Sequence, residues 1–349
     1  MTLTRDQIFS YVLPGQIADP TAMYPQASAA EALGIAGIFM SERWETKELG
    51  ATMGALAHAT SSLKLVAGLT HFGTRHPVVQ AGLAQTMQLL SGGRYVLGYG
   101  RGVPPHLKKL GVPVPNMQGM IDMVTILRKL WAGETVHYSG PAGDYPELQL
   151  PKGCDNPPPV IIGTIGPKTL AMAGTHFDGV VLHPFLSADG VASSASIVRK
   201  AAEAAGRDPM SVKVYATIVT APDTLSEDQR SDIVEARAVS YFMHPEIGRQ
   251  LAQINGWDEG PVNAITQTGL AALEYGTGDP QEKRRRMAEV ASLLPRSWIE
   301  DGTASGSIPR VVERLQHYAD AGADYILLHG TTPEQQGPIV AGLGGNAAG

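Results

Sequence analysis

Short, continuously apolar segments alternate with helix-period segments along almost the whole chain of 349 residues. Eight of the apolar segments have the length and composition of β-strands: FSYVLP (9–14), AGIFMS (36–41), LKLVAGLT (63–70), RYVLGYG (94–100), PVIIGT (159–164), DGVVLHP (178–184), VKVYATIVT (212–220) and DYILLHG (324–330). Strands without polar alternation are typical of a parallel sheet that helices cover. We therefore predict eight buried parallel strands.

Helices between these strands are indicated by their spacing. Residues 309–321 carry Pro309 near the start and Gly322 after the end, the usual asymmetry of helix termini. In residues 78–90 an apolar residue recurs every three or four positions, which predicts one buried face. That face consists of Val79, Leu83, Met87 and Leu90.

Eight strand–helix units in one chain favour an α/β fold of the TIM (β/α)8 barrel type, with a doubly wound open sheet as the alternative. No linker divides the sequence, so we expect one domain over residues 1–349 with two long insertions. Residues 133–158 are rich in Pro and Gly and follow a helix, so they are expected away from the catalytic face. Residues 221–300 read as several extra helices between the seventh and eighth strands. They follow a strand, so they are expected at the carboxyl ends of the strands, where barrel enzymes build active sites.

Composition narrows the class of protein. A hydrophobic content of 43% allows a large core, whereas a net charge of −6 gives no general attraction to nucleic acid. The one basic run, KRRR (283–286), is expected to be a solvated helix face, with a substrate-facing role left open. No apolar run is long enough for a bilayer, and MTLTRDQIFSYVLPGQ does not resemble an export signal, so we expect a cytoplasmic protein. Cys154 lies in the proline-rich PKGCDNPPP and is taken as structural.

Several kinds of catalysis are disfavoured by position or spacing. Lys64 and Lys213 stand at strand beginnings, which argues against a Schiff-base lysine and against a phosphosugar lyase or isomerase. There is no His-Glu-x-x-His motif, so we expect no metal site. His183 ends a strand on the functional side, where it could donate a hydrogen bond to a substrate or could be satisfied beneath a loop.

Glycines are concentrated at the predicted strand ends. In LLSGGRYVLGYGRG (89–102) the spacing does not match a dinucleotide fingerprint, because Val103 and Pro104 stand where a third glycine and a helix would be needed. In GTIGPKT (163–169) a glycine turn enters a helix, whose backbone amides attract phosphate. Candidate phosphate-side residues are Gly68, Gly100, Arg101, Gly102, Gly163, Gly166, Pro167, Lys168 and Thr169. The alternative is that these glycines only permit tight turns.

Five segments in order carry a wider pattern: AEALGIAGIFMSERW (30–44), LKLVAGLTHFGTRHP (63–77), QTMQLLSGGRYVLGYGRG (85–102), PPPVIIGTIGPKTLAMAGTHFDGVVLHP (157–184) and GSIPRVVERLQHYADAGADYILLHG (306–330). Together they resemble the bacterial luciferase-like superfamily of flavin- and deazaflavin-dependent barrels. Within it the chain looks more like the oxidoreductases that use coenzyme F420 than like FMN monooxygenases. The resemblance implies hydride transfer between the deazaflavin C5 and a small organic substrate, and a homodimer.

The resemblance also implies particular cofactor contacts. Family members often have a bulge with a non-proline cis peptide after the third strand, and the matching place is near Gly68 and Leu69, or one residue further on. Thr70 follows directly, and Arg75 belongs to the Arg-His-Pro continuation. With the glycine turns described above, these residues are expected to hold the cofactor.

The end of the second strand is the family's catalytic neighbourhood, and it departs from the family pattern here. Deazaflavin-dependent dehydrogenases commonly have Asp-His and a nearby Trp, whereas this chain has Glu42, Arg43 and Trp44. A guanidinium stays charged near neutral pH, so Arg43 is expected to polarise a carbonyl or steady an anionic substrate instead of moving a proton. Glu42 and His183 are then the candidate proton donors.

Two other readings of the resemblance stay open. An FMN-dependent luciferase-like monooxygenase would consume oxygen, because flavin and not deazaflavin supports oxygen chemistry. A non-catalytic flavin-binding barrel would bind a cofactor without turnover, and the departures at residues 42, 43 and 103 are compatible with it.

Overall fold

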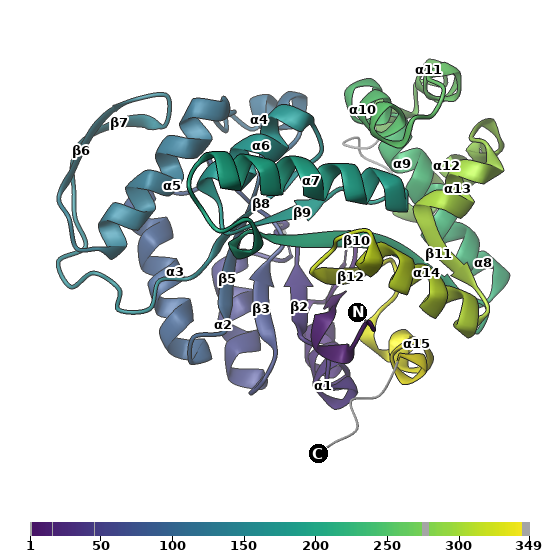
Figure 1. The fold of residues 1–349 in the computed structure, drawn as a ribbon, viewed down its shortest axis with the longest axis horizontal. Coiled ribbons are helices and arrows are strands. Elements are labelled where there is room, and N and C mark those ends of the chain that lie inside the picture. Colours follow the sequence, from purple (N-terminus) through teal and green to yellow (C-terminus); the bar gives the residue numbers. More distant parts are fainter. Residues whose placement is uncertain (1, 16, 45, 274–278, 344–349) are drawn as a thin grey trace.

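The computed structural model describes residues 2–15, 17–44, 46–273 and 279–343. Within these residues, eight parallel strands follow one another around a closed barrel, so the TIM-barrel prediction is confirmed and the open sheet is excluded (Figure 1). The barrel strands are β1 (Ile8–Tyr11), β2 (Gly37–Met40), β3 (Lys64–Ala67), β5 (Tyr95–Gly100), β8 (Val160–Thr164), β9 (Gly179–Leu182), β10 (Lys213–Pro222) and β12 (Tyr325–His329). The ring closes because β10 pairs with both β9 and β12.

The barrel interior is filled by one side chain from each strand. These eight buried residues form one cluster: Phe9, Phe39, Val66, Val96, Ile161, Val181, Tyr215 and Leu327. The Phe9 ring meets Phe39 and Tyr215 edge-on at centroid distances of 5.5 and 5.4 Å, an arrangement that aromatic pairs favour. The interior is therefore a packed core, and ligands must bind at its ends.

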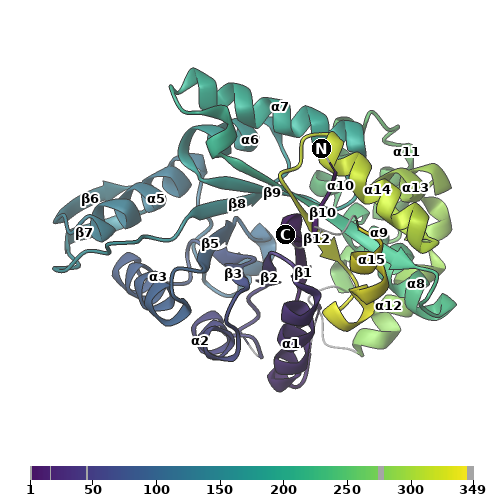
Figure 2. The ribbon, with the colours of Figure 1, turned by 60° about the horizontal axis from the view of Figure 1, so that its bottom comes forward.

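Helices surround the barrel, as Figure 2 shows from below. Side chains cap two of their starts: the Ser187 side chain accepts a hydrogen bond from the Gly190 amide, and Asn116 accepts one from the Gly119 amide. The ring consists of α1 (Met23–Leu33), α2 (Leu49–Ala59), α3 (Pro77–Ser91), α5 (Met117–Trp131), α6 (Pro167–His176), α7 (Ala188–Ala204), α14 (Ile308–Asp320) and α15 (Gly337–Gly342), with short 3-10 turns η1 (Arg5–Gln7), η2 (Pro20–Ala22), η3 (Pro209–Ser211) and η7 (Pro333–Gln336).

The predicted helix over residues 78–90 exists as α3, but its predicted buried face is only half right: Met87 is buried and Leu83 packs on the core, whereas the other two residues are exposed. Val79 and Leu90 are 58% and 60% exposed, whereas small and polar residues such as Gln80 and Ala84 are buried. Buried Gln88 is tolerated because its side chain accepts a hydrogen bond from the Tyr95 amide and donates one to the Asn156 carbonyl. Counting only apolar residues misplaces the face by about one position.

The first insertion contains a hairpin that the sequence reading did not predict. Strands β6 (Val136–Gly140) and β7 (Gly143–Leu148) pair antiparallel and lie outside α5 (Figure 1). The Tyr138 hydroxyl, which donates to Asp122 of α5 at 2.6 Å, fixes the hairpin there. Alternation of Val136, Tyr138 and Gly140 before a turn at Pro141 was the signal that could have indicated it.

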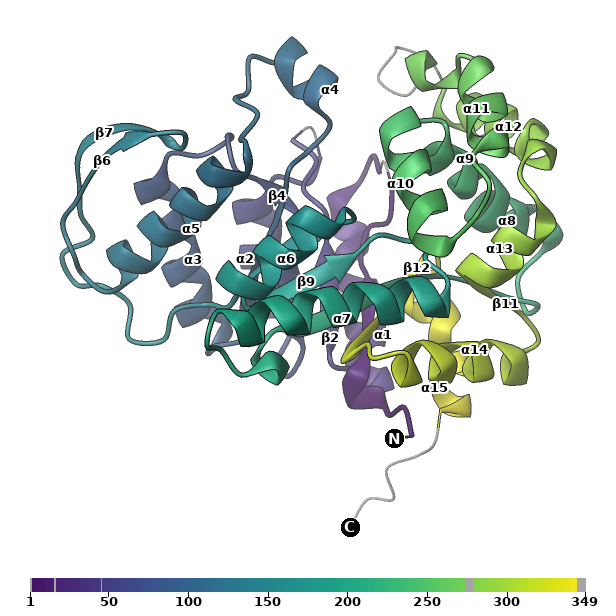
Figure 3. The same cartoon turned by 45° about the horizontal axis from the view of Figure 1, so that its top comes forward.

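The second insertion is helical, as predicted, and ends in a short strand, β11 (Thr303–Gly306), that pairs with the end of β10. Its elements are α8 (Glu227–Ser231), the π-helical turn η4 (Asp232–Ala236), α9 (Arg237–Phe242), α10 (Pro245–Asn255), α11 (Gly260–Gln267), η5 (Leu270–Leu273), α12 (Pro280–Glu289), η6 (Ala291–Leu293) and α13 (Arg296–Gly302). Figure 3 shows α10 and α11 on one side above the carboxyl ends of the strands and α4 (Pro104–Lys109) on the other. We call the space between these elements and the strand ends the barrel mouth.

Candidate active site

Glu42, in the loop after β2, is held by the segment that follows β3. Its side chain is buried and accepts a 2.5 Å hydrogen bond from the Thr70 hydroxyl, while Arg75 donates to both carboxylate oxygens. Because both oxygens are committed to protein donors and paired with a guanidinium, the carboxylate is poorly suited to give a proton to a substrate. The geometry therefore favours a positioning role for Glu42 over the expected donor role.

Arg75 joins two acidic residues beneath the barrel mouth. Besides Glu42 it donates to Glu48 at 2.5 Å and to the Thr70 hydroxyl at 3.1 Å. Burial acts to lower the pKa of Arg75, but the hydrogen bonds and ion pairs with Glu42 and Glu48 outweigh it and raise the pKa. Thr70 and Arg75, expected to contact the cofactor, thus also fasten the loop after β2 to the segment after β3.

Arg43 and Trp44 lie beside this network. Arg43 is exposed, and its backbone forms a small bridge with Lys47; within the described parts of the chain no carboxylate pairs with its guanidinium. Trp44 is half-buried between two histidine rings, at 5.3 Å from His71 and stacked at 6.2 Å on His106. The guanidinium of Arg43 is therefore available to a ligand, and Trp44 can form an aromatic wall.

Lys47 was missed by sequence reasoning, because nothing in its surroundings along the chain distinguishes it from a surface lysine. The structure buries it and directs its ammonium to the carbonyls of Leu13 and Gly15, each at 2.8 Å. Burial, followed by the nearby charge of Arg43, lowers the pKa of Lys47 to about 8. Lys47 ties the loop after β1 to the loop after β2.

Leu69 occupies a seat made by glycines. The peptide bond between Gly68 and Leu69 is cis, as the resemblance predicted. A Cβ on Gly163 would lie 2.2 Å from Leu69 Cδ1, and one on Gly100 would lie 3.3 Å away. These two glycines therefore leave room for Leu69, which packs on the interior cluster and remains partly exposed at the mouth. This packing role differs from both sequence readings of the two glycines, the phosphate site and the tight turn.

The end of β5 turns away through Gly102, which has a positive φ of 74°. A Cβ there would meet His71 Nδ1 and Leu107 Cδ1, each at 2.8 Å, so only glycine fits. Arg101, next to it, is exposed. Arg101 can therefore extend to an anionic group at this end of the mouth.

The start of α6 has the form of an anion site. Gly166 precedes the helix, Pro167 begins it, and the Thr169 hydroxyl donates to the Gly166 carbonyl at 2.9 Å. Lys168 is exposed in the first turn. A helix start with free amides and an adjacent cation attracts phosphate.

His183 follows β9 and is neutral at physiological pH. Burial lowers its pKa to about 4, which a hydrogen bond to the Pro184 carbonyl only partly offsets. A carbonyl can only accept, so His183 Nδ1, 3.0 Å away, carries the proton and Nε2 is left as an acceptor. A neutral ring in this tautomer does not suit the expected donor role, but it can orient a hydroxyl.

A second polar group gathers near His183, where β1 and β12 end. Arg237 donates to His329 Nε2 at 3.0 Å, the Tyr241 hydroxyl lies 3.3 Å from the same nitrogen, and the rings of Tyr11 and His329 are 4.9 Å apart. Tyr241 also meets His183 edge-on at 4.7 Å. We call these five residues the His–Arg cluster.

Sequence reasoning had identified only His183 in this cluster. Tyr11 and His329 end barrel strands just as His183 does, so the same criterion could have found them. Arg237 and Tyr241 come from the second insertion, and no pattern in the sequence indicates that α9 reaches the strand ends.

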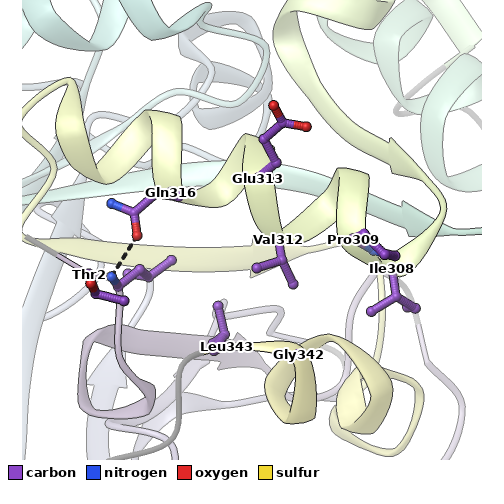
Figure 4. Close-up of a pocket in the computed structure, with 9 residues that line it drawn as sticks. Thr2, Ile308, Pro309, Val312, Glu313, Gln316, Gly342 and Leu343 are labelled. Atoms are coloured by element: carbon purple, nitrogen blue, oxygen red, sulfur yellow. Dashed lines mark hydrogen bonds between the residues drawn. The ribbon is translucent and has the colours of Figure 1, made fainter.

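Two sizeable cavities lie elsewhere. A cavity of about 460 Å³ between α14, α15 and Leu3 is mostly apolar, and the Leu3 amide there donates to Gln316 at 2.7 Å (Figure 4). Another of about 730 Å³ lies at the amino ends of the strands, beside Lys64 and Lys213. Neither shares a residue with the polar groups at the mouth, and barrel active sites form at the carboxyl ends.

Among the described residues no group of three or more His, Cys, Asp or Glu side chains could hold a metal ion. Within the same residues, none of the helices combines the length and apolarity needed to cross a membrane.

Comparison with known proteins places this arrangement in context. A family model described as luciferase-like monooxygenase matches residues 2–325. A 5,10-methylenetetrahydromethanopterin reductase of Archaeoglobus fulgidus is 25% identical over 302 residues, 85% of this chain and 86% of the relative. A phthiodiolone/phenolphthiodiolone dimycocerosates ketoreductase of Mycobacterium tuberculosis is 26% identical over 317 residues, 88% of this chain and 80% of the relative. The solved coenzyme F420-dependent tetrahydromethanopterin reductase from Methanopyrus kandleri has a TM-score of 0.77 at 20% identity, covering 97% of this chain and 98% of its own, which shows a shared fold.

Proposed function

We propose, from the premise that the chain belongs to the luciferase-like monooxygenase family, that it is an oxidoreductase that uses coenzyme F420 to exchange a hydride with a small organic substrate. Two relatives of similar length are named as a reductase and a ketoreductase. A protein with the same fold is named as F420-dependent. These names support a reductase or dehydrogenase that uses a deazaflavin.

The observation that carries the proposal is the seat of Leu69. A planar ring system needs an apolar surface to lie on and free space above that surface. Leu69, seated in the space that Gly100 and Gly163 leave free, offers a partly exposed apolar side chain at the mouth. The residues present therefore fit a deazaflavin ring lying on Leu69.

Cationic and backbone groups near this seat fit the phosphate side of the coenzyme. Arg101 is exposed at the end of β5, and Lys168 is exposed in the first turn of α6. β5 and β8 are paired neighbours, so the two ends lie on one side of the mouth. Together they would hold a phosphate through charge and free amides.

The chain's own residues have separable roles in this proposal. The bound coenzyme supplies hydride acceptance and donation at C5. Arg43 polarises the substrate carbonyl or stabilises an anionic group, and Trp44 forms an aromatic wall beside the substrate. His183, with Nε2 as acceptor, orients a substrate hydroxyl. Glu42, through Arg75 and Thr70, positions the loop that carries Arg43, and acceleration comes mainly from this positioning.

An assay of reduced F420 against ketones, enones and imines, and of oxidised F420 against alcohols, tests the proposal. We expect coenzyme turnover with at least one class in the absence of oxygen. Oxygen consumption with reduced FMN would support the monooxygenase alternative. Cofactor binding without turnover in any arm would support the non-catalytic barrel.

A further inference from the structure

Arg237 places a positive charge among side chains that do not neutralise it. It begins α9, immediately after the π-helical turn η4, a kind of turn that is frequent at functional sites. The nearby carboxylate of Asp232 is taken by Arg284 at 3.0 Å. Within the described residues no carboxylate forms an ion pair with Arg237, which donates to the neutral acceptor His329.

The proton positions in the His–Arg cluster leave it rich in donors. A guanidinium cannot accept, so His329 Nε2 must accept from Arg237 and the neutral ring carries its proton on Nδ1. That Nδ1 group and Arg237 Nε are both buried without a partner. The Tyr241 hydroxyl lies 3.3 Å from the same Nε2 and shares its one lone pair with Arg237, so it can turn its proton to another acceptor. Buried donors without acceptors are costly, so these two groups favour a bound acceptor.

The side chains of the cluster are partly accessible to solvent, and its Tyr11 feels the charge of Arg43. Tyr11, Arg237, Tyr241 and His329 each keep part of their surface exposed. Burial raises the pKa of Tyr11 most and Tyr241 adds to this, while the charges of Arg237 and Arg43 both oppose the rise. The Tyr11 hydroxyl therefore lies within electrostatic reach of both guanidinium groups.

We propose that the His–Arg cluster binds the carboxylate of an organic-acid substrate, with Arg237 as the charge partner and Tyr241 as an additional donor. This inference rests on the proposed function for what happens to the substrate, because Arg43 would then face the carbonyl or hydroxyl end that exchanges hydride. Arg237 and Arg43 together would fix both ends of one small molecule.

A carboxylate fits the cluster better than a phosphate. The guanidinium fork matches the two oxygens of a carboxylate, and one unpaired cation balances one negative charge. A phosphate group carries nearly two negative charges at neutral pH. The partly exposed side chains of Tyr11 and Tyr241 are themselves aromatic, which suits an organic tail.

Thermal unfolding and tryptophan fluorescence with hexanoate, hexanamide and inorganic phosphate test the inference without any coenzyme. We expect hexanoate to raise the melting temperature and to bind at least about tenfold more tightly than hexanamide. Equal binding of hexanoate and hexanamide would overturn it, and so would phosphate binding that is tighter than hexanoate binding and is lost in Arg237→Gln. This comparison uses the unaltered protein and does not depend on how any variant folds.

Variants then locate the site. Arg237→Gln should weaken hexanoate binding at least about tenfold. Arg237→Lys keeps the charge but loses the two-pronged guanidinium, so its hexanoate affinity should lie between those of the unaltered protein and Arg237→Gln. Arg286→Gln removes an exposed charge from the neighbouring helix α12 without releasing Asp232 from Arg284, and it should weaken binding less. Equal losses in Arg237→Gln and Arg286→Gln would contradict direct binding. If hexanoate binding follows this pattern while F420 does not bind, the inference stands and the proposed function fails.

Discussion

Leu69 has room for its side chain because the neighbouring residues 100 and 163 are glycines. Its place on the interior cluster requires glycine at Gly163 and nearly so at Gly100, because a Cβ at either position approaches the Leu69 methyls. These two glycines, which suggest phosphate binding in the sequence, therefore make room for Leu69. At the residue scale, any effect of these glycines on a cofactor passes through Leu69.

Gly163→Ala should displace Leu69 while leaving the fold intact, since the clash is with the end of a flexible side chain. We expect about 1–3 kcal/mol of destabilisation and at least about tenfold weaker F420 binding. Gly54→Ala is the matched control, because no atom lies within 4 Å of a Cβ there. Urea unfolding and fluorescence titration measure both quantities. Unchanged F420 affinity in Gly163→Ala would contradict the Leu69 support.

Glu42→Gln distinguishes positioning from proton transfer. Removing the buried partner of Arg75 should lower the free energy of unfolding by about 3 kcal/mol. Glu48→Gln should cost under about 1 kcal/mol, because the Glu48 side chain is 48% exposed. Urea denaturation compares the two. Full stability in Glu42→Gln together with lost turnover would restore Glu42 as a proton donor.

Among the site residues, those next to strand ends could be predicted from the sequence, whereas those contributed by segments distant along the chain could not. Glu42 and Leu69 were identified through local motifs of the family. Arg237 and Tyr241 were not, because their position depends on how the second insertion packs over the mouth. Lys47 was missed because burial of a lysine depends on carbonyls far along the chain.

At the scale of elements, the strands were predicted well because buried parallel strands are recognisable from composition alone. The hairpin β6–β7 was missed because only one of its faces is partly covered and its Gly and Pro residues read as loop. It lies outside α5, and its Tyr145 ring is 5.2 Å from the ring of His76 at the start of α3. The helical insertion was predicted as present, but its contacts with the strand ends are tertiary and leave no periodic signal.

Tyr138→Phe tests that the hairpin is a structural accessory. The change removes the hydroxyl that donates to Asp122 and accepts from the Ala142 amide at 3.0 Å. We expect a loss of about 1 kcal/mol in the free energy of unfolding and no change in F420 affinity. A change in affinity larger than about threefold would mean that the hairpin is coupled to the site.

At the scale of the whole molecule, two clusters of polar residues with different roles lie at the barrel mouth. The network of Glu42, Thr70 and Arg75 is internally neutralised and holds loops together. The His–Arg cluster keeps an unpaired guanidinium and neutral histidines. The fold thus separates the parts that organise the mouth from those left for ligands.

Two histidines with lowered pKa values predict how stability depends on pH. The folded-state pKa is lowered to about 4 for His183 and well below the ordinary value for His329, in both cases chiefly by burial. The unfolded chain binds these protons near pH 6.5, so stability is full above that pH and declines as the pH falls towards 4. Melting temperatures between about pH 7.5 and 5 should fall, and less steeply in His183→Asn. A constant melting temperature over that range would contradict the neutral buried state.

The most direct test of the central claim is a side-by-side titration of the protein with coenzyme F420 and with FMN, followed by quenching of its four tryptophans. The account predicts tight binding of F420, much weaker binding of FMN, and loss of F420 affinity in Gly163→Ala. Preferential binding of FMN, or binding of neither cofactor, would contradict it.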